Sequence, residues 1–153
     1  MTFASRHGVA VLGAAVMLVG CSSPDDQTQI ENLIRNAIRA THDRKPSGVL
    51  ERVAEDFKGP SGIDRSGAQR MLVGRLLQKK WTRVFERGID IEVTDGTARA
   101  SIDVVLAQGR NVERWEDLLP TEASVGRFDL ILSKRDDGWW ITEGKYTKTK
   151  SAF

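Results

Sequence analysis

The amino-acid sequence predicts an α+β domain in which three helices come first and four antiparallel strands follow. Apolar residues recur at the spacing of a helix face up to about residue 80, and from about residue 82 they alternate with polar residues as in strands. The turn sequences Thr-Asp-Gly at 94–96 and Asp-Asp-Gly at 136–138 each separate two alternating stretches, which is typical of β-hairpins. This order of elements predicts helices packed on one face of an antiparallel sheet.

The first predicted helix runs from Thr28 to about residue 43. Thr28 and Glu31 have the spacing of a capping box, in which each side chain bonds the backbone amide of the other residue. The helix is expected to end before Pro46, because the residue ahead of a proline rarely adopts helical angles. Its apolar face comprises Ile30, Leu33, Ile34, Ala37, Ile38 and Thr41.

Two further helices are expected before the strands. Ser47 is a candidate cap for a short second helix that runs into Phe57. Ser66 and Gln69 form another capping-box pattern, which predicts a third helix as far as about Lys80. The buried side of this third helix is expected to hold Leu72, Val73, Leu76 and Leu77.

Four strands are expected at about 82–93, 97–106, 127–135 and 139–147. In the first three, apolar and charged residues occupy opposite phases, so one face packs on the helices and the other carries the charges. Phe85 shares its phase with Ile89, whereas Glu86 lies in the charged phase. The last strand has aromatic residues in both phases, and we expect a β-bulge at Gly144. The other carboxylates expected to point away from the helices are Asp90, Glu92, Asp103 and Asp129.

A secretory signal is the clearest feature of the first twenty residues. Arg6 precedes an apolar run over 9–19, and a basic start followed by about ten apolar residues is typical of such signals. The run is too short for a stable membrane span, which needs roughly 20 apolar residues. The segment is therefore expected to be removed from the mature protein.

The end of this signal, Leu-Val-Gly-Cys at 18–21, resembles the lipobox of bacterial lipoproteins. That resemblance implies cleavage before Cys21, acylation of its thiol and attachment to the membrane through the lipid. Ser22 in place of an aspartate then favours the outer membrane, with the domain facing the periplasm. The alternatives are an ordinary signal with an incidental cysteine, or a short anchor that stays uncut.

Composition limits the partners and cofactors of the mature chain. Removal of residues 1–20 leaves 133 of the 153 residues, which is enough for one domain with a core. The loss of Arg6 leaves 22 basic and 21 acidic residues, a net charge of +1 that offers no attraction for nucleic acid. Cys21 is the only cysteine and His42 the only histidine of the mature chain, so no zinc site is expected. No other metal or cofactor is expected either; the alternative is a calcium site made of carboxylates alone, for which the sequence has no EF-hand-like loop. The predicted organisation is a signal at 1–20, a lipidated tether at 21–27, a folded domain at 28–148 and a loose tail at 149–153.

Three segments of the domain together resemble the nuclear transport factor 2-like superfamily, also called SnoaL-like or cystatin-like. They are the amphipathic helix at 30–41, the stretch Ala-Glu-Asp-Phe at 54–57 and the ending Asp-Asp-Gly-Trp-Trp-Ile at 136–141. The resemblance spans about 27–147. It implies three helices packed on a curved four-stranded sheet that wraps the first helix as a cone, a pocket at the mouth of the cone, and a homodimer through the outer face of the sheet. Activities in this superfamily vary widely, so the fold alone predicts no reaction.

Catalytic and binding residues can still be sought in the pattern. No carboxylate is expected to point into the cone, and His42 beside Asp43 is not a dyad because adjacent helical residues diverge, so we assign no catalytic residue. Trp140 and Tyr146 are expected at the cone mouth, where they contact a small apolar ligand or simply pack in the core. Trp115 lies in the long link 108–126, which either folds back over the sheet or forms a flap or a partner contact.

The sequence thus predicts a membrane-anchored periplasmic lipoprotein with a non-catalytic domain that binds an envelope protein or a small apolar ligand. The alternatives are a small-molecule isomerase or dehydratase of the SnoaL-like type, and an accessory lipoprotein of a larger envelope machine. A carboxylate with a raised pKa inside the cone would favour the enzyme.

Overall fold

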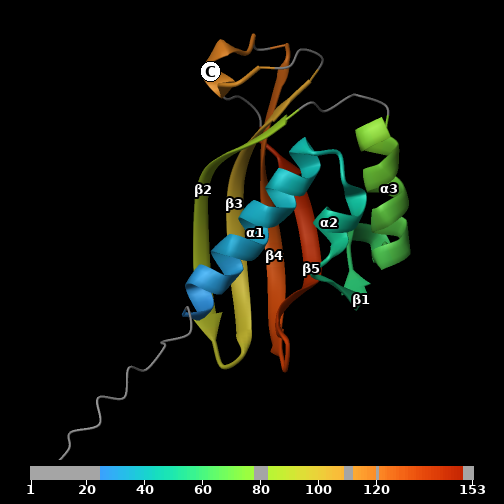
Figure 1. Ribbon diagram of the computed structural model, residues 1–153, viewed down its shortest axis with the longest axis vertical. Helices are drawn as coiled ribbons and strands as arrows, with labels where there is room; N and C mark the ends of the chain where they lie inside the picture. The colour runs from blue at the N-terminus through green and yellow to red at the C-terminus, as the bar shows by residue number, and fades with distance from the viewer. Residues whose placement is uncertain (1–24, 78–82, 109–111, 120, 150–153) are drawn as a thin grey trace, which may run out of the picture.

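The computed structural model describes residues 25–77, 83–108, 112–119 and 121–149. The predicted signal, Cys21 and most of the tether, the end of the third helix at Lys80 and the last residues of the tail lie outside this part of the chain. One antiparallel layer dominates it, and a long helix crosses one face of that layer (Figure 1). The helices are α1 (Asp26–His42), α2 (Pro46–Leu50) and α3 (Arg65–Leu77), with short 3₁₀ turns η1 (Pro60–Gly62) and η2 (Trp115–Asp117).

The sheet has five strands in the order β1-β5-β4-β3-β2. β1 runs parallel to β5, and the other neighbours are antiparallel. Helix α1 lies across β2, β3 and β4, whereas α2 and α3 lie at the β1 side of the sheet (Figure 1). The strands are β1 (Val53–Lys58), β2 (Arg83–Thr94), β3 (Thr97–Ala107), β4 (Ala123–Arg135) and β5 (Gly138–Lys148).

The fifth strand corrects the prediction of four. Residues 53–58 were expected to continue the second helix, but α2 ends at Leu50 and the chain then pairs with β5. The Ile141 amide donates to the Arg52 carbonyl at 2.8 Å, so the edge of an existing sheet supplies the hydrogen bonds that a helix would have made internally. Strand preference of this kind depends on the neighbouring strand more than on local sequence.

The helix caps also differ from the predicted ones. Asp25 caps α1 by accepting a hydrogen bond from the Thr28 amide at 2.7 Å, so Thr28 lies inside the helix. Asp64 accepts from the Gly67 amide at 2.7 Å at the start of α3, and Ser47 lies inside α2. In both long helices an aspartate placed earlier in the chain reaches the free amides of the first turn.

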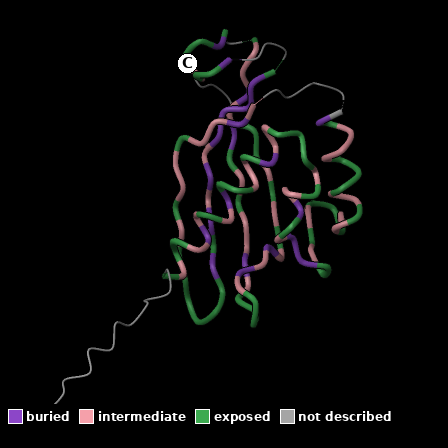
Figure 2. Tube along the Cα trace, viewed as in Figure 1, coloured by how far each residue is buried: buried purple, intermediate pink, exposed green. Residues whose placement is uncertain are grey.

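The main core lies between α1 and the sheet. Figure 2 shows buried residues concentrated on the central strands and under α1. Ile30 of α1 and Leu132 of β4 have no exposed surface. The predicted apolar faces of the first helix and of the middle strands are confirmed here, since the buried members of this cluster are Ile30, Ile34, Leu50, Val53, Val84, Ala98, Ala100, Ile102, Val104, Leu106, Leu132, Trp139 and Ile141.

A β-bulge in β2 changes which side chains reach this core. Glu86 pairs with Val104, whereas Gly88 pairs with Asp103, so one extra residue separates the two halves of the strand and the phase reverses. Phe85 therefore faces the opposite side of the sheet from Ile89, and Glu86 faces α1. Both positions were predicted the other way round, because strict alternation assumes a strand without a bulge.

A second bulge in β5 has a similar effect. Ile131 pairs with Glu143 and Leu132 with Ile141, which leaves Thr142 as the extra residue. The bulge was expected at Gly144, two residues later. Because of it, Trp139 before the bulge and Tyr146 after it both contact the main core.

A smaller apolar cluster lies on the other face, at one end of the sheet. It is built by β3 residues Val105 and Ala107 and is covered by the link segment, in which Val112 and Leu118 are buried. The link therefore folds back over the sheet, as one of the two expectations for it stated. Phe85, Trp115, Ala123 and Val125 pack around this cluster.

Candidate ligand groove

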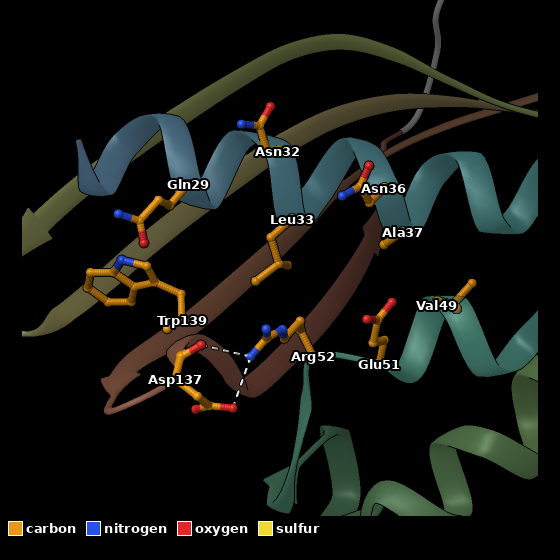
Figure 3. Close-up of a pocket in the computed structure, with 12 residues that line it drawn as sticks. Gln29, Asn32, Leu33, Asn36, Ala37, Val49, Glu51, Arg52, Asp137 and Trp139 are labelled. Atoms are coloured by element: carbon orange, nitrogen blue, oxygen red, sulfur yellow. Dashed lines mark hydrogen bonds and ion pairs between the residues drawn. The ribbon is translucent and has the colours of Figure 1, made fainter. Parts of the chain in front are cut away.

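A groove of about 340 Å³ lies between α1, α2 and the β4–β5 hairpin. Figure 3 shows α1 along one wall, Arg52 and Glu51 on the opposite wall, and the hairpin residues Asp137 and Trp139 at one end. The twelve lining residues are Gln29, Asn32, Leu33, Asn36, Ala37, Gly48, Val49, Glu51, Arg52, Asp137, Gly138 and Trp139.

The α1 wall of this groove carries three amide side chains. Gln29, Asn32 and Asn36 follow one another at intervals of three and four residues, which places them along one side of a helix. Gln29 lies beside Trp139, and Asn32 and Asn36 project from α1 farther along the helix (Figure 3). An amide side chain offers two donors and two acceptor positions. Asn36 Oδ1 already accepts from Arg39 Nη1 at 3.2 Å, so a ligand would use the donors and acceptors that remain on this wall.

The opposite wall is organised by Arg52. Its Nη1 donates to the carbonyl oxygen and to Oδ2 of Asp137, both at 3.2 Å. The Trp140 indole N–H donates to Asp137 Oδ1 at 2.7 Å, and this hydrogen bond, with a weaker effect of Arg52, lowers the pKa of Asp137. The guanidinium of Arg52 also lies 5.1 Å from the Trp140 ring centroid. Arg52 and Asp137 largely neutralise each other at this wall.

Trp139 closes the inner end of the groove and is only 3% exposed. Its indole N–H donates to Asp26 Oδ1 at 3.1 Å, and Lys134 Nζ donates to the same oxygen at 2.6 Å. The Lys134 hydrogen bond is the larger cause, and the Trp139 bond the next, of the lowered pKa of Asp26. These bonds join the start of α1 to the β4–β5 hairpin at this end of the groove.

The concave side of the sheet, where the cone was expected to open, is filled by apolar side chains over the described residues. Tyr146 packs against Phe128 with ring centroids 4.8 Å apart. Its hydroxyl is buried and has no hydrogen-bond partner among the described residues. The hydroxyl lies over Gly126, where a Cβ atom would come within 2.5 Å of it.

The structure places the three predicted contact residues in three different regions. Tyr146 lies in the main core, and Trp140 lies between Arg52 and Arg135 outside it. Trp115 lies in the small cluster on the far face, with Arg87 5.1 Å from its ring centroid. Trp140 and Tyr146 were expected at one cone mouth, and the bulge at Thr142 separates them. Of these residues, none lines the groove.

Among the described residues, Glu86 and His42 lie on the α1 side of the sheet, and each has a partner. Glu86 pairs with Arg35 at 3.4 Å. His42 Nε2 lies 2.8 Å from the Val84 carbonyl oxygen and 3.2 Å from the Val84 nitrogen, so this ring joins the end of α1 to β2. Glu86 was predicted to point outward, and the bulge beside it accounts for the difference.

Several findings about the described residues bear on the chemistry. No group of three or more His, Cys, Asp or Glu side chains there is placed to hold a metal ion. None of the helices described is long and apolar enough to cross a membrane. On the outer sheet face, Arg127 donates to both carboxylate oxygens of Asp103 at 2.7 and 3.0 Å, and this lowers the pKa of Asp103.

Acid is expected to lower the stability of the domain through its hydrogen-bonded aspartates. Hydrogen bonds lower the folded-state pKa of Asp25, Asp26, Asp56, Asp103 and Asp137. The unfolded chain then takes up protons first, near pH 4, so the stability contributed above that pH is lost as the pH falls through the folded-state values. Urea unfolding at pH 7, 5, 4 and 3 should show a plateau and then a steep decline.

The matched variants for this test are Asp26→Asn and Asp136→Asn. Asp26 bonds Lys134 and Trp139, whereas Asp136 is an exposed turn residue. Asp26→Asn should lower stability at pH 7 and flatten the decline, and Asp136→Asn should leave the profile unchanged. A stability that rises as the pH falls from 5 to 3 would contradict the assignment.

The sequence contained part of the signal for this groove. The amides at positions 29, 32 and 36 share one side of the first predicted helix with Leu33. Arg52 and Asp137, however, lie 85 positions apart in sequence, and no local pattern relates them. Attention to the amide residues beside the apolar face of the helix could have found one wall, but not the other.

Comparison with known proteins shows which solved structures share this fold. No family model matches the sequence, and no curated protein matches it. A nuclear transport factor 2-like protein of unknown function from Pseudomonas putida is similar in structure, with a TM-score of 0.65, 12% identity, and coverage of 82% of this chain and 87% of that one. A Nostoc punctiforme protein of unknown function with a cystatin-like fold has a TM-score of 0.63 at 13% identity, covering 82% and 92%.

A third similar structure comes from Novosphingobium aromaticivorans and is described as a candidate scytalone dehydratase. It has a TM-score of 0.64 at 15% identity, and the match covers 81% of this chain and 84% of that one. Identities this low show the fold and carry no reaction with them. The described domain therefore has the nuclear transport factor 2-like, or cystatin-like, fold.

Proposed function

We propose that this protein is a lipid-anchored component of a bacterial envelope whose domain binds a neutral polar ligand in the groove and catalyses no reaction. Two observations support this proposal. Apolar side chains pack together on the concave face of the sheet, and the groove, with its polar walls, lies beside that cluster.

The anchor follows from the lipobox-like end of the signal and from where the fold begins. Asp25 already caps α1, so only three residues separate it from Cys21. At about 3.5 Å per residue, this stretch reaches roughly 14 Å when extended. The start of α1 and both β-hairpins lie at the same end of the domain (Figure 1). The groove would therefore lie close to the membrane surface.

The absence of catalysis is supported by the electrostatics of the described residues. An acid–base enzyme of this fold needs a carboxylic acid or histidine whose pKa is tuned by the site. Every described carboxyl group with a shifted pKa is shifted downward by a hydrogen-bond donor. Glu86, the carboxylate on the α1 side, is held by Arg35.

The ligand class follows from the groove walls. The amides of Asn32 and Asn36 can bond hydroxyl or amide groups of a ligand in either direction. Arg52 is engaged by Asp137, and Glu51 on the same wall disfavours an anion. A neutral ligand with several hydroxyl or amide groups, such as a saccharide, matches these walls better than the small apolar ligand that the sequence suggested.

Binding can be tested with the full chain in detergent micelles and N,N′-diacetylchitobiose as the probe. Calorimetry should detect binding, and the double variant Asn32→Ala/Asn36→Ala should weaken it about thirtyfold, because each of the two lost hydrogen bonds contributes about 1 kcal/mol. Glu55→Ala, an exposed change on β1 outside the groove, should bind as the wild type does. Nuclear magnetic resonance spectra should show that the disaccharide stays intact.

Other outcomes would contradict this function. Binding of 1-naphthol but not of the disaccharide would favour an apolar site, and cleavage of the disaccharide would show an enzyme. Metabolic labelling with an alkyne analogue of palmitate should tag the wild type but not Cys21→Ser. If both remain untagged in a lipoprotein-processing host, the anchor is wrong whatever the groove binds.

A further inference from the structure

The two edge strands of the sheet, β1 and β2, differ in how far other residues form hydrogen bonds with their outer backbone groups. At the β1 edge, Arg65 of α3 donates to the Val53 carbonyl at 3.0 Å and to the Leu50 carbonyl at 3.3 Å. At the β2 edge, His42 contacts the backbone nitrogen and oxygen of Val84. Side chains thus form hydrogen bonds with backbone groups of the edge strands at β1 and at the beginning of β2. The remainder of β2, from Gly88 to Thr94, has no such side-chain hydrogen bonds to its outer edge among the described residues.

The backbone direction in this part of β2 can be deduced from two independent observations. His42 reaches both polar groups of Val84, so Val84 must present them away from β3. At the other end, Thr94 and Thr97 close a two-residue turn and exchange their hydrogen bonds with each other. In an antiparallel pair, the N–H and C=O groups of successive residues point alternately toward the partner strand and away from it. Counting back from Thr94, whose groups point toward β3, the groups of Val93, Ile91 and Ile89 point away from β3. Counting forward from Val84 gives the same result once the extra residue of the bulge is included.

These three residues form a regular and uncovered template for another strand. Residues 88–94 pair with β3 in unbroken register. They include no proline or lysine, two of the residues that commonly protect an edge, and the charged side chains they do carry are Asp90 and Glu92. Among the described residues, none bonds the outward backbone groups of Ile89, Ile91 or Val93. Figure 1 shows β2 at the margin of the sheet, with α1 over its face but not along its edge.

The side chains along this edge define what could pair with it. Ile89 and Ile91 are partly exposed and Val93 is 38% exposed on the α1 side. Asp90 and Glu92 are exposed on the other side. A second copy pairing antiparallel through the same residues would set Asp90 opposite Glu92 of its partner twice, and like charges directly opposite are destabilising. A strand with basic residues at those positions would form opposite-charge pairs instead.

We propose that the β2 edge at 88–94 is a docking site for an extended segment of another protein, in which lysine or arginine alternates with apolar residues. The segment extends the sheet to six strands through the outward groups of Ile89, Ile91 and Val93. Its apolar side chains lie beside these residues, and its basic side chains lie beside Asp90 and Glu92. This site is separate from the groove, and its existence does not depend on what the groove binds.

The test uses the full chain in detergent micelles and a fluorescein-labelled heptapeptide of alternating lysine and valine. Fluorescence anisotropy should detect binding at 20 mM salt, and a peptide with glutamate in place of lysine should not bind. Methylation of the valine amide nitrogens should abolish binding, because those amides face the edge. Methylation of the lysine amide nitrogens should leave it intact, because those amides face solvent.

Two protein variants distinguish charges on the β2 edge from charges elsewhere on the outer face of the sheet. Asp90→Lys/Glu92→Lys should weaken the lysine peptide at least about tenfold and create binding of the glutamate peptide. Glu143→Lys, on the same outer face but on β5, should change neither affinity. Equal binding of both methylated peptides, an equal effect of Glu143→Lys, or no binding of the lysine peptide would overturn the proposal.

Discussion

Replacement of Trp139 by alanine is expected to lower the free energy of unfolding by about 3–5 kcal/mol, as for other buried aromatic residues. Trp139 is 3% exposed, packs in the main core and donates to Asp26 at 3.1 Å. The substitution creates a cavity under α1 and removes one of the links between that helix and the β4–β5 hairpin. Urea unfolding at pH 7 measures the change.

Two matched variants separate the causes of this loss. Trp139→Phe retains an aromatic ring but loses the N–H donor, and should cost about 1–2 kcal/mol. Trp140→Ala removes the neighbouring indole, which is half-exposed and interacts with Arg52 and Arg135, and should cost about 1–2 kcal/mol. If Trp140→Ala were as damaging as Trp139→Ala, the two side chains would not lie on the sides of the sheet described above.

Gly126→Ala is the second large effect, with an expected loss of about 2–3 kcal/mol from overpacking. A Cβ atom at Gly126 would lie 2.6 Å from the Thr147 carbonyl oxygen and 2.5 Å from the Tyr146 hydroxyl. The carbonyl belongs to the adjacent strand backbone, so a change of side-chain rotamer cannot relieve that contact. Accommodation requires β4 and β5 to separate where Tyr146 packs on Phe128.

The control for Gly126 is Gly74 in α3. A Cβ atom there meets nothing within 4 Å, so Gly74→Ala should raise stability by about 0.5–1 kcal/mol through helix propensity. The two substitutions are chemically identical and should change the urea midpoint in opposite directions. A neutral Gly126→Ala would mean that the two strands are not packed as closely as the structure shows.

The sequence predicted most elements because their signals are local. The apolar face of α1 and the alternation along β3 each repeat over ten or more residues, and burial against water requires them to face one way. The turns at 94–96 and 136–138 have glycine at positions of positive φ, Gly96 at 76° and Gly138 at 117°. These signals need no knowledge of the rest of the molecule.

The predictions failed where a neighbouring segment decides the outcome. Residues 53–58 became a strand because β5 offers them a hydrogen-bonding edge. The bulge at Arg87 puts Glu86 on the α1 side of the sheet, and the bulge at Thr142 puts Trp140 and Tyr146 on opposite sides. A single extra residue changes the local sequence little, yet it moves every later side chain to the other face.

The sequence by itself determined the fold class, the two hairpins and most of the apolar faces, because periodicity and short-range turn chemistry are properties of contiguous residues. Only the tertiary structure decided that the concave face is filled, that the amides of α1 face Arg52 and Asp137, and that the β2 edge is uncovered from Gly88 to Thr94. The physical reason is that each of these features depends on packing between segments that are far apart in the chain, and register shifts of one residue control that packing.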